Sequence, residues 1–326
     1  MANNGYQFVN WTEDGTEVST SASYTINNIT ADHTLVANFA INSYTICATA
    51  NPTDGGTVTG AGTYDYGTCC TLTATANEGF VFYYWSADNV LVYWEESVEW
   101  VSYDATYPFL VYWNRNYVAH FAMSNDDGHA YVDLGLPSGT LWAICNVGAT
   151  SPEDYGDYYA WGEIQPKDYY NWSPYQYCNG SPNTLIKYCN RSSYGYNGFT
   201  DNLTTLQPED DAATTNWGAG WRMPTREEWI ELYNNTTVTW TTQNGVKGRL
   251  FTANNGNTLF LPAAGHRWDD ELHYAGIHGY YWSSSLRTEI PTCARSFGFY
   301  SDEYSIGWYY RSYGLSVRPV RSAPQN

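Results

Sequence analysis

The feature that most constrains the fold is an internal repeat in the first 123 residues. The segment NEGFVFYYWS at 77–86 has the pattern of NNGYQFVNWT at 3–12, and RNYVAHFA at 115–122 has that of DHTLVANFA at 32–40. Between these segments, apolar and polar residues alternate along runs that are separated by Gly-rich turns. This period of two predicts small antiparallel β-structure, present in two copies.

These units resemble the internalin B-repeat-like modules that are common in bacterial surface and adhesive proteins, through GGTVTGAGTY, CTLTATANEGF and the closing VANF or VAHF. The resemblance implies small all-β modules that act as a spacer or stalk. We expect a partial module at 1–41 and a second module at 42–123 with an aromatic-rich insertion. This insertion either caps the next domain or forms a second contact surface, because exposed Tyr and Trp supply contact area at low entropic cost. The candidate contact residues are Tyr93, Trp94, Trp100, Tyr112 and Trp113.

The character of the sequence changes after SNDDGHA at 124–130, which is polar, contains Gly and is predicted to be a linker. From 131 to 322, segments that are typical of strands alternate with long loops, and a short tail follows at 323–326. The segment GRLFTANNGNTLFLPAAG predicts two strands joined by an Asn-Asn-Gly turn.

The strongest helix signal in the chain is PTREEWIELYNN. Thr225 as N-cap and Glu228 three residues later form a capping box, and Trp229 and Leu232 are spaced to face inward. With one clear helix among strands, we expect residues 131–322 to form an α+β domain with few helices.

Six motifs of this second part occur in a fixed order: DLGLPSGTLWAICNVGA, PEDYGDYYAWGE, WRMPTREEW, LFLPAAG, GYYWSSS and GLSVRPV. Over residues 128–322 the chain resembles the bacterial major paralogous domain (FISUMP). The resemblance implies an α+β C-type-lectin-like fold, which is related to formylglycine-generating enzymes and to the variable proteins of diversity-generating retroelements. In those variable proteins, adenines in selected codons, mostly Asn codons, are randomised.

The last part of the chain combines a regular frame with side chains that share neither size nor polarity. The frame comprises GYYWSSS, Ala294, Arg295, Phe297, Phe299 and GLSVRPV. The residues between frame positions are of types that an Asn codon can reach by adenine substitution, and strand alternation would turn them outward. The resemblance therefore implies a variable surface that binds a ligand. The alternative is an ordinary surface whose residues are fixed. Its candidate residues are Leu272, His273, Tyr274, Ile277, His278, Ile290, Thr292, Cys293, Ser296, Gly298, Tyr300, Asp302, Tyr304, Ile306, Tyr309, Tyr310, Ser312 and Tyr313.

Enzyme chemistry is not expected, and no residue is assigned a catalytic or metal-binding role. A formylglycine-generating site would need a pair of reactive cysteines at suitable positions. Here Cys145 suits a core position, and Cys293 suits a variable surface position. The acidic runs lie in polar loops, and the His spacing fits no familiar metal site. We expect no cofactor, with a structural calcium ion left open. The seven cysteines leave two alternatives open. They are small buried thiols, or disulfide bonds join Cys47 to one of Cys69 and Cys70, and Cys178 to Cys189.

The net charge of −19 disfavours nucleic acid and anionic membranes as partners, and no apolar run is long enough to span a membrane. The start, MANNGYQFVNW, has no signal-peptide pattern, so we expect the natural anchor or signal to lie upstream. The resulting hypothesis is a non-enzymatic adhesion or receptor-binding protein at a cell surface or phage tail tip, with a protein or glycan ligand on another cell. Its alternatives are a carbohydrate-binding surface protein with a fixed site and a structural subunit of a fibre. The oligomeric state stays open.

Overall fold

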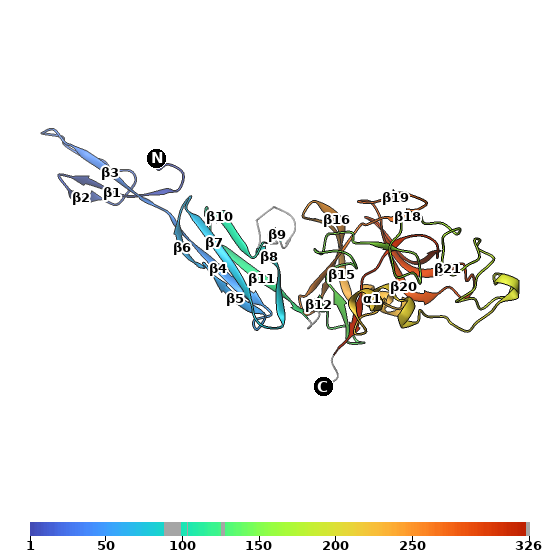
Figure 1. The fold of residues 1–326 in the computed structure, drawn as a ribbon. Coiled ribbons are helices and arrows are strands. Elements are labelled where there is room, and N and C mark those ends of the chain that lie inside the picture. The colour runs from blue at the N-terminus through green and yellow to red at the C-terminus, as the bar shows by residue number, and fades with distance from the viewer. Residues whose placement is uncertain (88–98, 103, 125–127, 324–326) are drawn as a thin grey trace. The chain divides into compact units, whose positions relative to one another are not determined.

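The computed structural model describes residues 1–87, 99–102, 104–124 and 128–323. The chain divides into two compact units, Met1–Ala122 and Met123–Asn326 (Figure 1). Each unit is described below by itself. Of the predicted contact residues, Tyr93 and Trp94 lie outside the described residues, and Trp100 is described only as part of a strand.

The first unit is built from strands in three groups. One sheet has the order β2-β1-β3, a second has the order β10-β7-β5, and in a third β11 pairs with β4 and β8, with β6 beyond β4 and β9 beyond β8. The strands are β1 (Tyr6–Glu13), β2 (Thr16–Ser19), β3 (Leu35–Ile41), β4 (Ser43–Asn51), β5 (Gly56–Thr59), β6 (Gly62–Asp65), β7 (Cys69–Ala76), β8 (Phe80–Ala87), β9 (Glu99–Ser102), β10 (Thr106–Leu110) and β11 (Arg115–Ser124).

The predicted period of two is confirmed in these strands. Along β7, Cys70, Leu72 and Ala74 are buried, whereas Cys69 and Thr71 are exposed. The inward residues of β7 and of its neighbours enclose a core that includes Ile46, Trp85 and Tyr117. Two sheets each with one apolar face bury those faces against each other, which is the usual way that small β-modules obtain a core.

The second unit combines small sheets with short helices. Its strands form a five-stranded sheet of order β14-β23-β20-β21-β22, the arrays β12-β13-β24 and β15-β16-β17, and the hairpin β18-β19. The elements are β12 (Ala130–Asp133), β13 (Thr140–Ala143), β14 (Tyr158–Tyr159), η1 (Tyr196–Gly198), η2 (Pro208–Asp210), α1 (Ala212–Trp217), α2 (Arg226–Asn234), β15 (Thr236–Gln243), β16 (Val246–Ala253), β17 (Thr258–Pro262), β18 (His266–Trp268), β19 (Glu271–His273), β20 (Gly279–Leu286), β21 (Cys293–Phe299), β22 (Tyr304–Tyr310), β23 (Leu315–Ser316) and β24 (Val320–Ser322).

The predicted capping-box helix is confirmed as α2. The Thr225 hydroxyl accepts a hydrogen bond from the backbone N–H of Glu228, and the Glu228 carboxylate accepts one from the backbone N–H of Thr225. Trp229 and Leu232 are buried, and the Trp229 ring stacks on Phe297 of β21 with centroids 4.9 Å apart. The two strands predicted around the Asn-Asn-Gly turn are also present, as β16 and β17.

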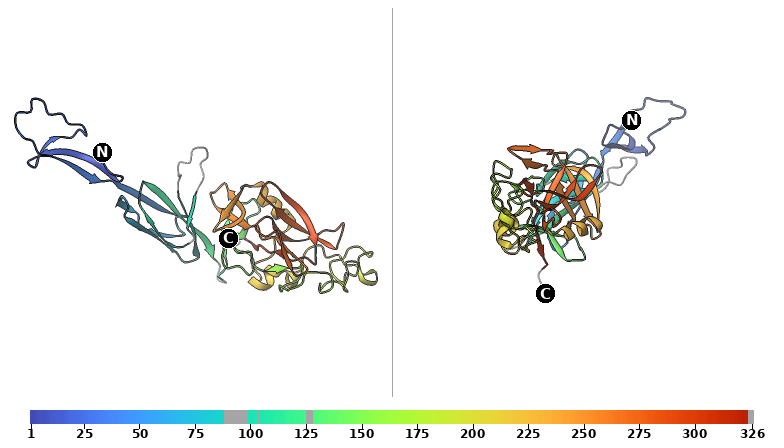
Figure 2. Two further views of the ribbon diagram at one scale, coloured as in Figure 1. Left: turned by 90° about the horizontal axis from the view of Figure 1, so that it is seen from above. Right: turned by 90° about the vertical axis from the view of Figure 1, so that its right-hand side faces the viewer.

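The predicted α+β class with a C-type-lectin-like fold is wrong. The described residues contain two α-helices, of six and nine residues, among strands, so the unit is mostly β. Figures 1 and 2 show that the green-to-yellow stretch before α1 runs for a long distance with little regular structure. Gly, Pro, Asn and Ser are frequent in that stretch, and these residues favour turns over helices.

The core of the second unit is rich in large aromatic residues, and three arginines are buried in this unit: Arg249, Arg311 and Arg318. Trp161, Trp221 and Trp282 are almost completely inaccessible. Arg311 donates from Nε to the Tyr175 hydroxyl at 2.8 Å, and its Nη atoms donate to backbone carbonyl groups. These bonds satisfy a charge that burial alone would make very unfavourable.

All seven cysteines lie in the described residues and are free thiols. The predicted bridge between Cys47 and the Cys69–Cys70 pair is absent, because β4 and β7 are not neighbours in a sheet. Cys178 and Cys189 are likewise unbridged, and their thiols instead contact backbone carbonyl oxygens.

Candidate ligand-binding surface

Several predicted site residues meet in one cluster of rings on the second unit. Tyr274 stacks on His278, with centroids 4.9 Å apart, and His278 lies against Tyr300 at 5.3 Å. Tyr313 contacts both Tyr309 and Tyr310, at 5.9 and 5.7 Å. These two groups of rings come from the segment 272–280, from the turn after β21 and from the end of β22, which are distant in sequence.

Two residues without a predicted site role, His266 and Tyr280, join the groups. The Tyr280 ring lies 4.8 Å from Tyr309, and its hydroxyl shares a hydrogen bond of 2.7 Å with His278 Nδ1. His266 stacks on Tyr313 with centroids 5.7 Å apart and also contacts His273 at 5.6 Å. The whole set is called the aromatic surface below and comprises His266, Trp268, His273, Tyr274, His278, Tyr280, Tyr300, Tyr309, Tyr310 and Tyr313.

His266 is the buried centre of the aromatic surface. Burial, with a further contribution from the neighbouring His273 and His278, lowers the pKa of His266 to about 4. Its Nδ1 atom has no hydrogen-bond partner among the described residues. The imidazole is therefore neutral at physiological pH and acts as a packing ring rather than as a charged group.

The outer layer of the aromatic surface is open to solvent. Tyr274 is 54% exposed, and Trp268, Tyr300 and Tyr310 are also exposed. Ile277 in the adjoining turn is 57% exposed, whereas Leu272 pairs with Arg267 and faces away from His266, Trp268 and His273. His273, His278, Tyr309 and Tyr313 are half-buried beneath or beside them. Large apolar and aromatic side chains that stay exposed next to a packed support are the kind of surface that protein and ligand partners bury.

Five predicted surface positions are buried and do not belong to an exposed surface: Thr292, Cys293, Ser296, Gly298 and Ser312. Strand alternation predicts one outward face only where a sheet has an open side. The strand β21 is interior to its sheet and is covered on both sides. Trp229 packs on one face over Phe297, and on the other face the Tyr280 ring covers Gly298.

Tyr304 and Ile306 lie on a different face from the aromatic surface. They pair with Phe299 and Phe297, so their side chains share the α2 side of the sheet, and the Tyr304 ring stacks on Tyr233 of α2. Asp302 is exposed in the turn between β21 and β22. Tyr310 pairs with Cys293 on this same side of the sheet, and it joins the aromatic surface through its contact with Tyr313 just after β22. The structure therefore divides the predicted set between two faces of the sheet.

A pocket of about 490 Å³ adjoins the aromatic surface. Its connection is Tyr310, which contacts Tyr313 on one side and Trp172 on the other, the latter at 6.2 Å. Burial raises the pKa of the Cys293 thiol in this pocket, which keeps it protonated and unreactive. The lining residues are Trp172, Pro182, Asn183, Tyr194, Ile290, Thr292, Cys293, Trp308 and Tyr310.

The sequence-based prediction missed His266, Trp268, Tyr280 and Trp172. Trp268 could have been found, since a Trp followed by two Asp residues in a polar turn has little reason to be in a core. The hairpin β18-β19 brings it to the site, where it lies 6.0 Å from Tyr313. Among the described residues, no group of three or more His, Cys, Asp or Glu side chains is arranged to hold a metal ion.

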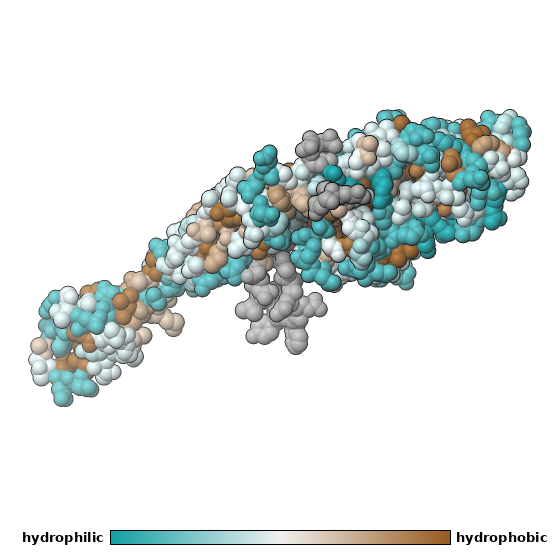
Figure 3. Space-filling model, turned by 90° about the horizontal axis from the view of Figure 1, so that it is seen from below, coloured by the Kyte–Doolittle hydropathy of each residue, from teal (hydrophilic) through white to brown (hydrophobic). Residues whose placement is uncertain are grey.

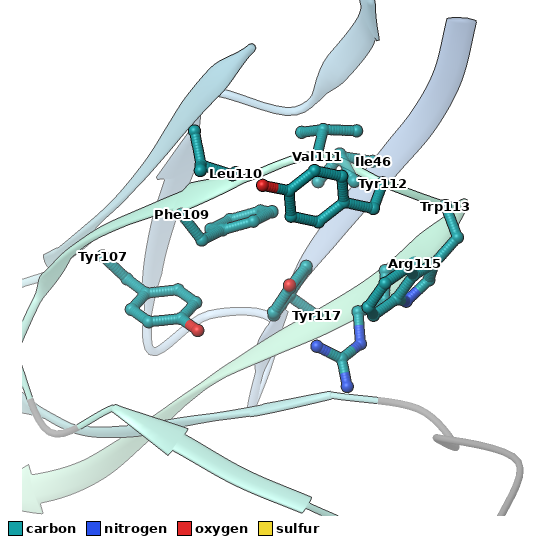
Figure 4. Close-up of a pocket in the computed structure, with 9 residues that line it drawn as sticks. All are labelled: Ile46, Tyr107, Phe109, Leu110, Val111, Tyr112, Trp113, Arg115 and Tyr117. Carbon is teal, nitrogen blue, oxygen red and sulfur yellow. The ribbon is translucent and has the colours of Figure 1, made fainter. Parts of the chain in front are cut away.

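A second aromatic site lies in the first unit, in the turn between β10 and β11. Tyr112 and the 52% exposed Trp113, both predicted contact residues, lie 6.0 Å apart there. They line a pocket of about 240 Å³ together with Ile46, Tyr107, Phe109, Leu110, Val111, Arg115 and Tyr117 (Figure 4).

The first unit matches a known protein family. Residues 1–43 and 46–125 match the family model of the divergent InlB B-repeat domain. No curated protein and no solved structure gave a significant match to the chain. The predicted B-repeat resemblance is thus confirmed, and B-repeat modules are typical of extracellular and surface proteins.

The match covers two B-repeats in succession, and the second contains Tyr112 and Trp113. No helix in the described ranges is long and apolar enough to cross a membrane. On the face of the molecule drawn in Figure 3, apolar residues occur in small separate groups among polar ones. Among the described residues of the second B-repeat, the exposed large hydrophobic side chains are Leu110, Tyr112 and Trp113, at the end of β10 and in the turn after it.

Proposed function

We propose that the second unit is a non-enzymatic ligand-binding domain of an adhesion or receptor-binding protein, and that the B-repeats serve as its spacer. The observation that carries the proposal is the set of ring contacts that holds the exposed Trp268, Tyr274 and Tyr300 in the aromatic surface. Binding would come from burial of these side chains, with polar neighbours fixing the orientation of the ligand.

The charge around the aromatic surface narrows the choice of ligand. Asp270, Glu271, Asp302 and Glu303 are exposed near its edges, and the whole chain has a net charge of −19. Like charges across an interface oppose association, so a neutral or basic protein or glycan is favoured over an acidic one. Nucleic acid and anionic lipid surfaces are disfavoured for the same reason.

We further propose that the exposed positions of this surface are diversified between copies of the gene. The motif order over residues 128–322 resembles that of the bacterial major paralogous domain, and this resemblance of motifs supports the idea. The candidates Tyr274, Ile277 and Tyr310 are exposed, whereas frame residues such as Tyr281 and Phe297 are buried. Substitution at exposed positions would leave the core unchanged, which is what a diversified surface requires.

Sequencing the gene across a population of its host, from the codon of Leu261 to the stop codon, tests diversification. We expect substitutions concentrated at the exposed positions of the aromatic surface and absent from Tyr281, Trp282 and Phe297. An invariant region, or substitutions spread evenly over buried and exposed codons, would show that the surface is fixed.

Binding is tested with the labelled full chain on intact bacterial cells and on a glycan array. The variant Trp268→Ser/Tyr274→Ser/Tyr300→Ser changes three exposed residues of the aromatic surface, and it should lose most of the binding that the unaltered chain shows. The control variant Ile186→Ser/Tyr196→Ser/Phe199→Ser changes exposed apolar residues of the same unit outside the aromatic surface, and it should bind normally. Equal binding by both variants would show that the aromatic surface is not the binding site.

A further inference from the structure

We infer that the pocket in the second B-repeat is a separate sugar-binding site, which takes one pyranose ring of a glycan. The site is independent of the aromatic surface of the second unit, because all nine lining residues belong to the first unit.

The turn that carries the exposed rings is fixed by backbone hydrogen bonds. The N–H of Val111 donates to the Thr68 carbonyl at 3.0 Å, and the N–H of Gly67 donates to the Val111 carbonyl at 2.7 Å. The Asn114 side chain accepts a hydrogen bond of 2.7 Å from the N–H of Thr45 in β4. A turn held from two sides presents its side chains in a set geometry, which lowers the entropic cost of binding.

The rings themselves are supported by other rings. Tyr107 and Phe109 stack at 5.1 Å, and Phe109 lies 4.9 Å from the buried Tyr117. Tyr112 is held edge-to-face by Tyr66 at 5.1 Å. In the view of Figure 4, Trp113 and Arg115 lie at one end of the pocket and Tyr107 at the other, with the Tyr112 ring between them.

The chemistry of the lining suits a sugar better than an apolar group. A pyranose ring has a face of C–H groups, which packs on aromatic rings, and an edge of hydroxyl groups, which need hydrogen-bond partners. The pocket offers both kinds of residue, since Tyr112 and Trp113 are exposed aromatic residues, and Tyr107, Tyr112 and Arg115, which carry polar groups, are among its lining residues. The guanidinium lies 5.7 Å from the Trp113 ring centroid, so ring and donor sit together.

The size and charge of the pocket disfavour drug-sized ligands and basic ligands. At about 240 Å³ the pocket is smaller than the roughly 300–1,000 Å³ typical of sites for drug-sized ligands, so it holds one ring-sized group. Its charged lining residue is the cation Arg115, which disfavours basic ligands. A glycan that places one sugar ring here and extends along the surface fits both limits.

The experiment applies the labelled full chain to a glycan array and then measures the strongest binder in solution by calorimetry. Trp113→Ala should weaken that glycan roughly tenfold or more, because loss of a buried aromatic anchor commonly reaches that size. Phe39→Ala, which removes an exposed ring elsewhere in the first unit, should leave binding unchanged. The triple Trp268/Tyr274/Tyr300 variant should also retain it, which separates this site from the proposed function of the second unit.

Three results would overturn the inference. The first is that the unaltered chain binds no glycan. The second is that Trp113→Ala leaves the glycan affinity unchanged. The third is that Trp113→Ala changes the sedimentation coefficient of the protein and not its glycan affinity. The last would identify the pocket as a contact between copies of this chain. A thermal melt of Trp113→Ala that matches the unaltered chain ensures that a loss of binding is not a loss of fold.

Discussion

The imidazole of His266 stacks almost parallel on the ring of Tyr313, with centroids 5.7 Å apart and an interplanar angle of 6°. Ser312, which precedes Tyr313, is completely buried. Gly314, which follows Tyr313, exchanges two backbone hydrogen bonds with Arg267. The pair thus joins the hairpin β18-β19 to the end of β22. It fixes the inner layer on which the exposed residues of the aromatic surface rest.

The stability of the second unit should fall as the pH is lowered from about 6.5 to about 4. Burial lowers the pKa of His266 to about 4 in the folded protein, whereas in the unfolded chain it has its ordinary value near 6.5. Above pH 6.5 both states hold a neutral ring and stability is complete. Below it the unfolded state binds the proton more readily, so the free energy of unfolding falls by about 2–3 kcal/mol by pH 4.

Urea unfolding followed by hydrogen exchange at a series of pH values measures this dependence for each unit. His266→Phe should flatten the curve for the second unit. His120, whose burial also lowers its pKa to about 4, lies in the first unit, so His120→Phe should flatten only the curve of that unit. A second unit whose stability is constant between pH 4 and 6.5 would contradict a buried neutral His266.

Replacement of Tyr309 should cost stability, whereas replacement of its neighbour Tyr310 should cost little. Tyr309 is half-buried against the core and lies 4.8 Å from the Tyr280 ring, while Tyr310 is exposed. We expect Tyr309→Ala to lower the free energy of unfolding by about 2 kcal/mol or more, since it leaves a cavity. Chemical denaturation of the two variants checks this, and equal losses would mean that the two rings are equally exposed.

Removal of the buried guanidinium of Arg311 should be strongly destabilising. Arg311→Met leaves the Tyr175 hydroxyl and the carbonyl groups of Tyr188 and Pro291 without their donor, and we expect a loss of about 3 kcal/mol or more. Arg295→Met is the control, because Arg295 pairs with the exposed Glu289, and its effect should be much smaller. Comparable melting temperatures for the two variants would contradict the buried network.

Two glycines of the second unit should respond in opposite ways to replacement by alanine. A Cβ at Gly248 in β16 would collide with the Leu261 carbonyl oxygen and the Phe260 ring, so Gly248→Ala should destabilise the protein by about 1–3 kcal/mol. A Cβ at Gly220 would meet no atom within 4 Å. Gly220→Ala should therefore be neutral or slightly stabilising, because it restricts the unfolded chain. Thermal unfolding of both variants tests the packing around β16.

The sequence alone determined the elements whose causes are local. The capping box of Thr225 and Glu228 acts over three residues, and α2 begins where it predicts. The alternation along β7 and the turn between β16 and β17 are likewise set by neighbouring residues. Two adjacent B-repeats were also readable, because a repeat compares one part of the chain with another and needs no knowledge of packing.

Only the tertiary structure decided which side of each strand is covered. Ser296, Gly298 and Ser312 have the local pattern of surface residues, yet they are buried because Trp229, Tyr280 and other distant residues pack over β21 and its surroundings. His266 and Tyr313 are 47 positions apart in the sequence, and only the pairing of Arg267 with Gly314 brings them together. Burial is the sum of contacts from the whole unit, so no local pattern could have assigned it.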